Sequence, residues 1–456
     1  MNKRQKNSTQ EPVSVGFVSL GCAKNLVDSQ VMAGVLVTEG VALARSAEEA
    51  DVVIINTCSF IEDARKEAAD TINEICGLKR SRQCKAVLVT GCLPQRYGSD
   101  LRKQFPDVDA FIGVDQIDKV GEIVKRVAKG QTNILEISKA PSRLFEPRLP
   151  GVVFTGGPFA YLKIAEGCNH HCSFCAIPAI RGKHRSRRIR DIVKEAEQLL
   201  ANGIRELNLI SQDTTWYGRD LDDGTDLPSL IRELGRLGGT FWIRLLYGYP
   251  AGITDELLEI MAGTSQVCHY FDIPIQHSHP DILRAMKRGG TITHMRQMAQ
   301  RIRNVMPDVT LRTTCLVGFP GETDKHFDDL LDFMTVTEFD HLGVFTYSPE
   351  DGTTAADMPN DVDPALSEER RDRILAIQKE VVDRRSQRLI GTDVEVLLEK
   401  SHPDDDTAWI GRSRSLAPEV DGAVLIANAA SDTKAGDFVK VRYTRQLEYD
   451  MEAVIG

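Results

Sequence analysis

The sequence has no apolar stretch that approaches the length of a membrane span, although the chain runs to 456 residues. Its first residues, 1–6, are mostly polar or charged, and no apolar core of a secretory signal follows them. These two absences predict a cytoplasmic protein with no membrane partner. Disulfide bonds are rare in that compartment, so the ten cysteines indicate metal binding or catalysis.

The chain also lacks an excess of basic residues. Its 56 Lys and Arg are outnumbered by 66 Asp and Glu, which gives a formal net charge of −10. Affinity for nucleic acid depends mostly on Lys and Arg contacts to phosphate, so no strong nucleic-acid binding is expected. A negative charge is compatible with a basic protein as partner, because complementary charge speeds and orients the encounter.

Three cysteines lie close together in the segment 166–175, which reads Glu-Gly-Cys-Asn-His-His-Cys-Ser-Phe-Cys. Three thiolates within eight residues can hold three corners of a cubane iron–sulfur cluster and leave the fourth iron open to a substrate or cofactor. The residues concerned are Cys168, Cys172 and Cys175. The alternatives are a zinc site with His170 or His171 as fourth ligand, or cysteines that are simply buried.

Three further cysteines each follow a predicted buried strand in the N-terminal part. The strands are expected at Val13–Leu20, Asp51–Thr57 and Lys85–Thr90, and predicted helices at Leu26–Glu39 and Glu62–Leu78 separate them. This βαβαβ order predicts a parallel sheet, whose strands all end at one edge. There we expect a second cluster site with an open iron, on Cys22, Cys58 and Cys92.

A structural alternative exists for each of these cysteines, because a small apolar residue often caps a strand. The remaining cysteines lack such a placement and are expected to be structural: Cys76, Cys84, Cys268 and Cys315.

The patterns predict an α/β protein in three parts. Residues 12–128 form the N-terminal parallel domain, and a linker rich in Pro and Gly covers 129–153. Residues 154–391 alternate strands and helices in about six repeats, which predicts a partial or full parallel barrel. Its strands are expected at Phe159–Ile164, Glu206–Ile210, Phe241–Leu246, Tyr270–Ile275, Val309–Val317 and His341–Phe345.

The last part, residues 392–456, has short alternating runs that predict a small antiparallel β-barrel. It contains thirteen acidic and seven basic residues, a net charge of −6. Such a module is poorly suited to grip RNA.

The cysteine run, with an aromatic residue before its third cysteine, is typical of radical S-adenosylmethionine (SAM) proteins. Together with the N-terminal trio and the C-terminal module, it makes almost the whole chain resemble the radical SAM methylthiotransferases. The resemblance implies a flavodoxin-like N-terminal domain, a radical SAM barrel and a TRAM domain. Residues 19–29, 166–182 and 345–350 are similar to the branch that modifies an aspartate of ribosomal protein uS12.

The resemblance also implies the chemistry. SAM would bind the open iron of the cluster on the 168–175 run, and its reductive cleavage would give a radical that removes a hydrogen from the aspartate β-carbon. The second cluster would carry the sulfur, and a second SAM would give the methyl group. The implied cofactors are thus two [4Fe-4S] clusters and SAM, and the partners are uS12 with an unidentified electron donor and sulfur source.

Other residues of the barrel are weaker candidates for SAM binding. Phe174 is expected near the adenine unless it is a core residue, and Gln212 and Gly318 lie where strands end. Gln276 and His277 either face the cavity or form a polar rim. The basic run 181–190 is expected to be a solvated face unless one arginine pairs with the SAM carboxylate.

Two other functions are compatible with the sequence. A related branch of the same enzymes methylthiolates a modified adenosine in tRNA. A non-catalytic metal-binding module that docks on the ribosome would also contain clustered cysteines.

Overall fold

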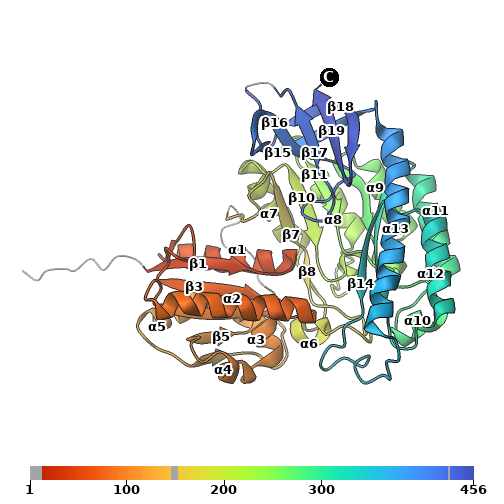
Figure 1. Ribbon diagram of the computed structural model, residues 1–456. Helices are drawn as coiled ribbons and strands as arrows, with labels where there is room; N and C mark the ends of the chain where they lie inside the picture. The colour runs from red at the N-terminus through yellow and green to blue at the C-terminus, as the bar shows by residue number, and fades with distance from the viewer. Residues whose placement is uncertain (1–12, 145–151, 430–431, 456) are drawn as a thin grey trace, which may run out of the picture. The chain divides into compact units, whose positions relative to one another are not determined.

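The computed structural model describes residues 13–144, 152–429 and 432–455 of the chain (Figure 1). The chain divides into two compact units. One comprises Met1–Phe154 with Ala179–Arg181, and the other comprises Thr155–Pro178 with Gly182–Gly456. The N-terminal cysteine trio belongs to the first unit and the 168–175 run to the second.

The first unit is built on a parallel sheet of six strands in the order β2-β1-β3-β4-β5-β6. The strands are β1 (Ser14–Ser19), β2 (Ala42–Leu43), β3 (Val52–Thr57), β4 (Ala86–Gly91), β5 (Ala110–Ile112) and β6 (Ile134–Glu136). The parallel sheet and its three long strands were predicted from the sequence. The other three strands have only two or three residues, too few to show a pattern, and β6 lies in the segment expected to be a linker.

Helices cover both faces of this sheet. They are α1 (Ala23–Thr38), α2 (Glu62–Arg80), α3 (Cys92–Tyr97), α4 (Asp100–Gln104), the 3₁₀ turn η1 (Val114–Lys119) and α5 (Val120–Ala128). Ile72 of α2 packs in one core with Val53 and Ile55 of β3. Since side chains alternate along a strand, the intervening residues point to the other face, where α1 and α5 contact β3.

The second unit contains six parallel strands in the order β14-β13-β12-β11-β10-β7. They are β7 (Phe159–Lys163), β10 (Glu206–Ile210), β11 (Trp242–Leu245), β12 (Val267–Asp272), β13 (Thr310–Val317) and β14 (His341–Thr346). The sheet is open, so it is a partial barrel. A short antiparallel pair, β8 (Ala165–Glu166) with β9 (Arg185–Ser186), brackets the cysteine loop.

Helices alternate with these strands. They are α6 (Ile177–Arg181), α7 (Ile189–Ala201), η2 (Thr214–Trp216), α8 (Leu227–Leu234), η3 (Pro250–Gly252), α9 (Asp255–Gly263), α10 (Pro280–Ala285), α11 (Ile292–Val305), α12 (Asp324–Thr337) and α13 (Pro364–Leu389). The long helix α13 lies beside α12 and β14, as Figure 1 shows. Within the described ranges, no helix combines the length and apolar character needed to cross a bilayer.

The C-terminal strands close into a barrel in the order β15-β16-β17-β19-β18. They are β15 (Asp393–His402), β16 (Asp405–Ser413), β17 (Val424–Ala427), β18 (Phe438–Leu447) and β19 (Asp450–Ile455). The predicted small antiparallel β-barrel is confirmed, with one exception to its pairing, because β17 and β19 pair in parallel. The last strand, β19, closes the barrel by pairing with β17 on one side and with β18 on the other. It runs in the same direction as β17.

Candidate active site

The three N-terminal cysteines follow adjacent strands of the first sheet. Cys22 is the N-cap residue of α1, just after β1, while Cys58 directly follows β3 and Cys92 begins α3 directly after β4. Because β1, β3 and β4 are neighbours, their ends bring the three cysteines to one edge. The approach is close: a Cβ on Gly21, whose φ is +86°, would lie 2.6 Å from the Cβ of Cys58.

Asn25 ties these strand ends together. From the first turn of α1, its Nδ2 donates to the carbonyl oxygens of Leu20 at 3.1 Å and Thr57 at 3.0 Å. Its Oδ1 lies 3.7 Å from the Sγ of Cys92, which donates to it. One amide side chain thus contacts the loops after β1 and β3 and the cysteine after β4.

A buried arginine lies against the same cysteines. The Nη2 of Arg181 donates to Oδ1 of Asn25 at 2.5 Å and to Sγ of Cys92 at 3.5 Å, and its Nη1 pairs with Asp28 at 2.9 Å. Arg181 is only 2% exposed, and Arg187 is buried as well. The expectation that the whole run 181–190 is a solvated face is therefore wrong, because buried carboxylates compensate these two charges.

Burial governs the protonation of the N-terminal trio. It raises the pKa of Cys92 to about 12, and it raises the pKa of Cys58 with a smaller contribution from the nearby Cys22. The pKa of Cys22 is lowered despite burial, because Lys24 and Arg181 are close. Since metals bind thiolates, loading this site would release protons.

The 168–175 run forms a loop that follows β7 and β8. The N–H of Cys168 donates to the carbonyl oxygen of Gly182 at 3.1 Å. Gly167 has a φ of +81°, and a Cβ there would come within 2.1 Å of the carbonyl oxygen of Lys183. Only glycine allows this approach. The loop thus lies where parallel strands end, the edge at which such sheets place their chemistry.

Burial also raises the pKa values of two thiols in this loop. The pKa of Cys168 rises to about 11 and that of Cys175 to about 12. The neighbouring Cys172 adds to both shifts.

The spacing of the sulfurs argues against a single zinc ion in either trio. A tetrahedral zinc site holds its ligands about 2.3 Å from one ion, which brings them close to one another. In the described ranges, one group of three possible ligands lies within 4.8 Å of one another, and neither cysteine trio forms it. Wider sulfur-only donor sets fit an iron–sulfur cluster.

Gln212 offers a free acceptor near the loop. Its Nε2 donates to Glu166 at 2.7 Å, and Glu166 pairs with Lys163 at 2.8 Å. The Oε1 of Gln212 is buried without a hydrogen-bond partner. A buried acceptor of this kind is costly unless a ligand satisfies it, so the position suits a ligand N–H.

Gly318 and Phe174 have packing roles in the structure. The φ of Gly318 is +74°, its N–H donates to Glu322 at 3.0 Å, and a Cβ would lie 2.1 Å from Oγ of Ser367 in α13. Phe174 packs against an apolar cluster that includes Met286. The core alternative for Phe174 is thus supported, while SAM contact by either residue stays a prediction.

Gln276 and His277 differ in their surroundings. Gln276, at φ +69°, is half-buried and pairs through its backbone with Thr314 on β13. His277 is fully buried, and its Nδ1 accepts the N–H of His279 at 2.9 Å. His277 therefore belongs to the buried interior of the second unit.

The remaining four cysteines are all buried, as expected of structural residues: Cys76, Cys84, Cys268 and Cys315. Cys76 and Cys84 lie in one apolar core of the first unit. Burial raises the pKa of each of the four.

The group within 4.8 Å is His279, Asp281 and His326. The Nδ1 of each histidine already accepts a backbone N–H, from Asp281 at 3.2 Å and from Thr323 at 3.3 Å. A neutral ring that accepts at Nδ1 carries its proton on Nε2, which leaves no lone pair there for a metal. The two histidines act as helix caps.

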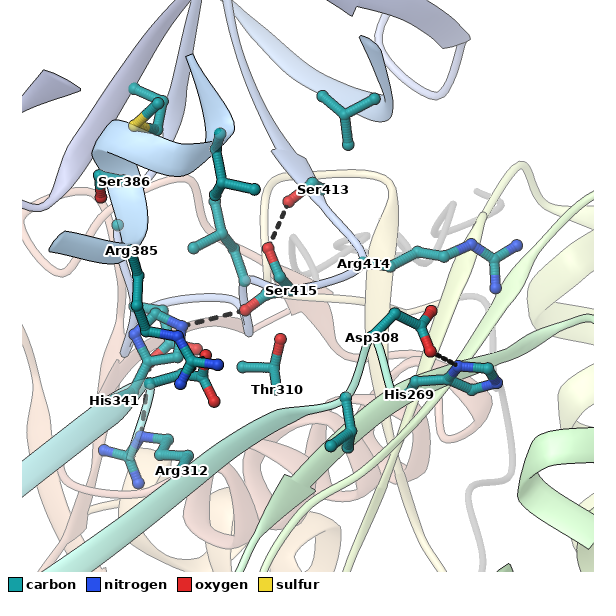
Figure 2. A pocket seen from close by; sticks show the side chains of 18 of the residues that line it. His269, Asp308, Thr310, Arg312, His341, Arg385, Ser386, Ser413, Arg414 and Ser415 are labelled. Carbon is teal, nitrogen blue, oxygen red and sulfur yellow. Dashed lines mark hydrogen bonds and ion pairs between the residues drawn. The ribbon is translucent and has the colours of Figure 1, made fainter. Parts of the chain in front are cut away.

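A cavity of about 1290 Å³ lies between the C-terminal barrel, α13 and the first residues of β12, β13 and β14 (Figure 2). It is thus at the opposite end of these strands from the cysteine loop. Two of the groups that line it pair with protein atoms: His269 with Asp308 at 2.7 Å, and Arg414 with the carbonyl oxygen of Ser265 at 2.9 Å. We assign no chemistry to this cavity.

Comparisons with known families match the three parts in order. Residues 14–113 match Uncharacterized protein family UPF0004, residues 162–334 the Radical SAM superfamily, and residues 390–455 the TRAM domain. Among solved structures, the radical SAM methyltransferase TsrM from Kitasatospora setae shares the fold with a TM-score of 0.56, at 15% identity and 74% coverage of each chain. The fold and the sites define a radical SAM enzyme with an added cysteine domain and a TRAM barrel.

Curated relatives cover nearly the whole chain. The ribosomal protein uS12 methylthiotransferase RimO of Natranaerobius thermophilus is 42% identical over 96% of this chain and 98% of its own length. The RimO of Symbiobacterium thermophilum is 44% identical over 96% of this chain and 90% of its own. The chain belongs to the RimO family of radical SAM methylthiotransferases.

Proposed function

We propose that the chain methylthiolates the β-carbon of an aspartate in ribosomal protein uS12, the protein after which its relatives are named. One observation carries the proposal: two cysteine trios each lie where the strands of a parallel sheet end. One such site would hold the cluster that a radical SAM enzyme needs, and the second would hold the cluster that carries the sulfur to be transferred. Because the target is ribosomal, we place the enzyme in the cytoplasm.

The first site is the loop after β8. Cys168, Cys172 and Cys175 would hold a [4Fe-4S] cluster whose fourth iron binds SAM. Bound together, cluster and SAM supply a carbon radical able to remove an unactivated hydrogen. The unpartnered Oε1 of Gln212 would accept an N–H of SAM, and Gly318 and Phe174 would line the same region.

The second site is the edge formed by Cys22, Cys58 and Cys92. These residues would hold a second [4Fe-4S] cluster, with an open iron that carries the sulfur to be transferred. Asn25 and Arg181 orient its ligands through their contacts with Cys92. An unidentified electron donor and an unidentified sulfur source complete the reaction.

Anaerobic reconstitution tests the two sites together. The full-length chain is expected to bind about eight irons, and alanine at the three cysteines of one trio should leave about four. Reduction in the presence of SAM should release 5′-deoxyadenosine unless the 168–175 trio is replaced. Zinc without iron would contradict the proposal.

A deletion strain tests the substrate. Mass spectrometry should find the uS12 aspartate unmodified in that strain. Loss of a methylthio nucleoside from tRNA, with uS12 still modified, would instead assign the chain to RNA.

A further inference from the structure

The 168–175 loop is bordered by a stack of aromatic and cationic side chains. The ring of His170 stacks on Tyr249 with centroids 3.9 Å apart and planes 15° apart. The edge of His170 meets Trp216, with ring centroids 5.4 Å apart. The guanidinium of Arg288 also lies over Tyr249, 4.5 Å from its centroid. These residues come from four separate segments, so the sequence alone does not associate them.

Arg288 extends from this stack to one of the cysteines. Its Nη1 donates to the Sγ of Cys172 at 3.6 Å, and its Nη2 donates to the carbonyl oxygen of Pro274 at 2.7 Å. Two hydrogen bonds and the ring of Tyr249 therefore fix the planar guanidinium in one orientation. The guanidinium is a cation that combines a positive charge with a fixed fork of N–H donors.

We propose that Arg288 is a positioning residue that sets the reduction potential of the cluster held by Cys168, Cys172 and Cys175. This inference rests on the proposed function, which requires that cluster. Reduction adds negative charge, and a cation hydrogen-bonded to a ligand sulfur stabilises the reduced cluster more than the oxidised one. Arg288 would thus make the reduction that the proposed reaction needs less unfavourable.

The structure also shows why arginine suits this position. A lysine would keep the charge, but its ammonium is a point charge without the planar fork that reaches Cys172 and Pro274 together. Tyr249 supplies the face on which the fork rests, and His170 packs on Tyr249. The expected order of reduction potentials is therefore wild type, then Arg288→Lys, then Arg288→Met at the most negative value.

The test is an EPR-monitored redox titration of the full chain. Cys22, Cys58 and Cys92 are replaced by alanine, so that the signal comes from one cluster. Arg288→Met should retain about four irons and shift the potential negative by about 59 mV, a tenfold lower ratio of reduced to oxidised cluster at fixed potential. Arg284→Met is the matched control, because Arg284 is exposed and pairs with Asp281, three residues earlier on the same helix.

An unchanged reduction potential in Arg288→Met would overturn the inference. If the KM for SAM is raised at the same time, the result would mean that Arg288 binds SAM. If Arg288→Met loses its cluster, Tyr249→Leu is used for the same titration. Its reduction potential should shift to a more negative value by less than about 59 mV. An unchanged potential in Tyr249→Leu would contradict the inference. Absence of a cluster from the chain with native Arg288 would instead contradict the proposed function.

Discussion

Arg181 shows how one residue can decide the properties of the N-terminal cysteine trio. It is buried with Asp28, and it donates to both Asn25 and Cys92. Its positive charge opposes the effect of burial on all three thiols of the N-terminal trio. Removing it would break the buried pair with Asp28 and leave three cysteines that are harder to ionise.

We expect Arg181→Met to destabilise the chain by about 3–5 kcal/mol, because it removes one partner of a buried ion pair, in which Arg181 lies 2.9 Å from Asp28. Urea unfolding measures this loss. The variant should also bind about four irons instead of eight after reconstitution. Arg190→Met, at a residue whose side chain is 84% exposed, is the control and should change neither property. Normal iron content in Arg181→Met would contradict the role given to Arg181.

The sequence indicated the six clustered cysteines, because their spacing and their positions after strands are local patterns. It did not indicate Arg181, Asn25 or Arg288, since the partners of each lie far away in the sequence. A basic run such as 181–190 is usually solvated, and only the packed structure shows which of its members are buried. Burial and partners are tertiary properties.

At the scale of elements, the turn between β13 and α12 and the loop between β12 and α10 each contain a buried group, and the pKa values of the two groups shift in opposite directions. Burial raises the pKa of Glu322 to about 7, although Arg370 lies 2.9 Å away. Burial lowers the pKa of His277 to about 3, and its Nε2 lies 3.7 Å from Glu322. The two groups therefore change the free energy of unfolding in opposite directions as the pH changes.

For Glu322, the folded chain holds more protons than the unfolded chain between about pH 4.5 and 7, so stability falls as pH rises through that range. Glu322→Gln removes this effect. Between pH 5.5 and 7.5 the free energy of unfolding of the wild type should fall by about 2 kcal/mol relative to the variant. Urea unfolding at both pH values measures the difference, and a constant difference would contradict the raised pKa.

For His277, the free energy of unfolding of the wild type relative to His277→Asn should change with pH in the direction opposite to that for Glu322. The unfolded chain holds more protons than the folded chain between about pH 3 and 6.5, so His277 costs stability as pH falls. The wild type should lose about 1 kcal/mol relative to His277→Asn on going from pH 7.5 to 5.5.

The C-terminal barrel attaches to the second sheet through a buried ion cluster. Glu206, the first residue of β10, pairs with Arg244 at 2.7 Å and with Arg412 of β16 at 2.5 Å. The exposure of Glu206 and Arg244 is zero. Breaking such a cluster from one side leaves uncompensated buried charge.

We expect Glu206→Gln to destabilise the chain by about 3–5 kcal/mol, because two buried guanidinium groups would lose their common carboxylate. Thermal and urea unfolding measure this loss. Glu452→Gln breaks an exposed pair with Arg445 in the same barrel and should change stability little. Equal stability of the two variants would contradict the assigned attachment.

The main elements follow from sequence periodicity, and the predicted β10 matches the observed bounds. The sequence did not predict very short strands such as β2 and β5. It also did not predict that β17 and β19 run in the same direction, because barrel closure decides this. Those features depend on neighbouring strands rather than on the pattern within the segment itself.

At the scale of the whole molecule, the negative charge of the C-terminal barrel is partly used internally. Glu419 accepts from the hydroxyl of Tyr161 at 2.6 Å, and Asp421 accepts from that of Tyr270 at 2.7 Å. Asp404 and Asp405 are exposed and remain available to a basic partner. Only part of the acidic barrel can therefore act in substrate capture.

Asp404→Lys with Asp405→Lys should raise the KM for uS12 several-fold at low salt and leave kcat unchanged, because the first effect of a surface charge is on encounter. The difference should shrink at high salt. Asp70→Lys with Glu259→Lys makes the same change in net charge elsewhere and is the control. An unchanged KM in the first variant would exclude this surface as the contact.

The most direct test of the account is the mass of a uS12 peptide after reaction with the fully reconstituted chain, SAM and a reductant. The wild type should add one carbon, two hydrogens and one sulfur at the aspartate. Cys168→Ala should abolish this product together with SAM cleavage, whereas Cys58→Ala should abolish the product and leave SAM cleavage intact. Full product formation by Cys58→Ala would contradict a two-cluster enzyme.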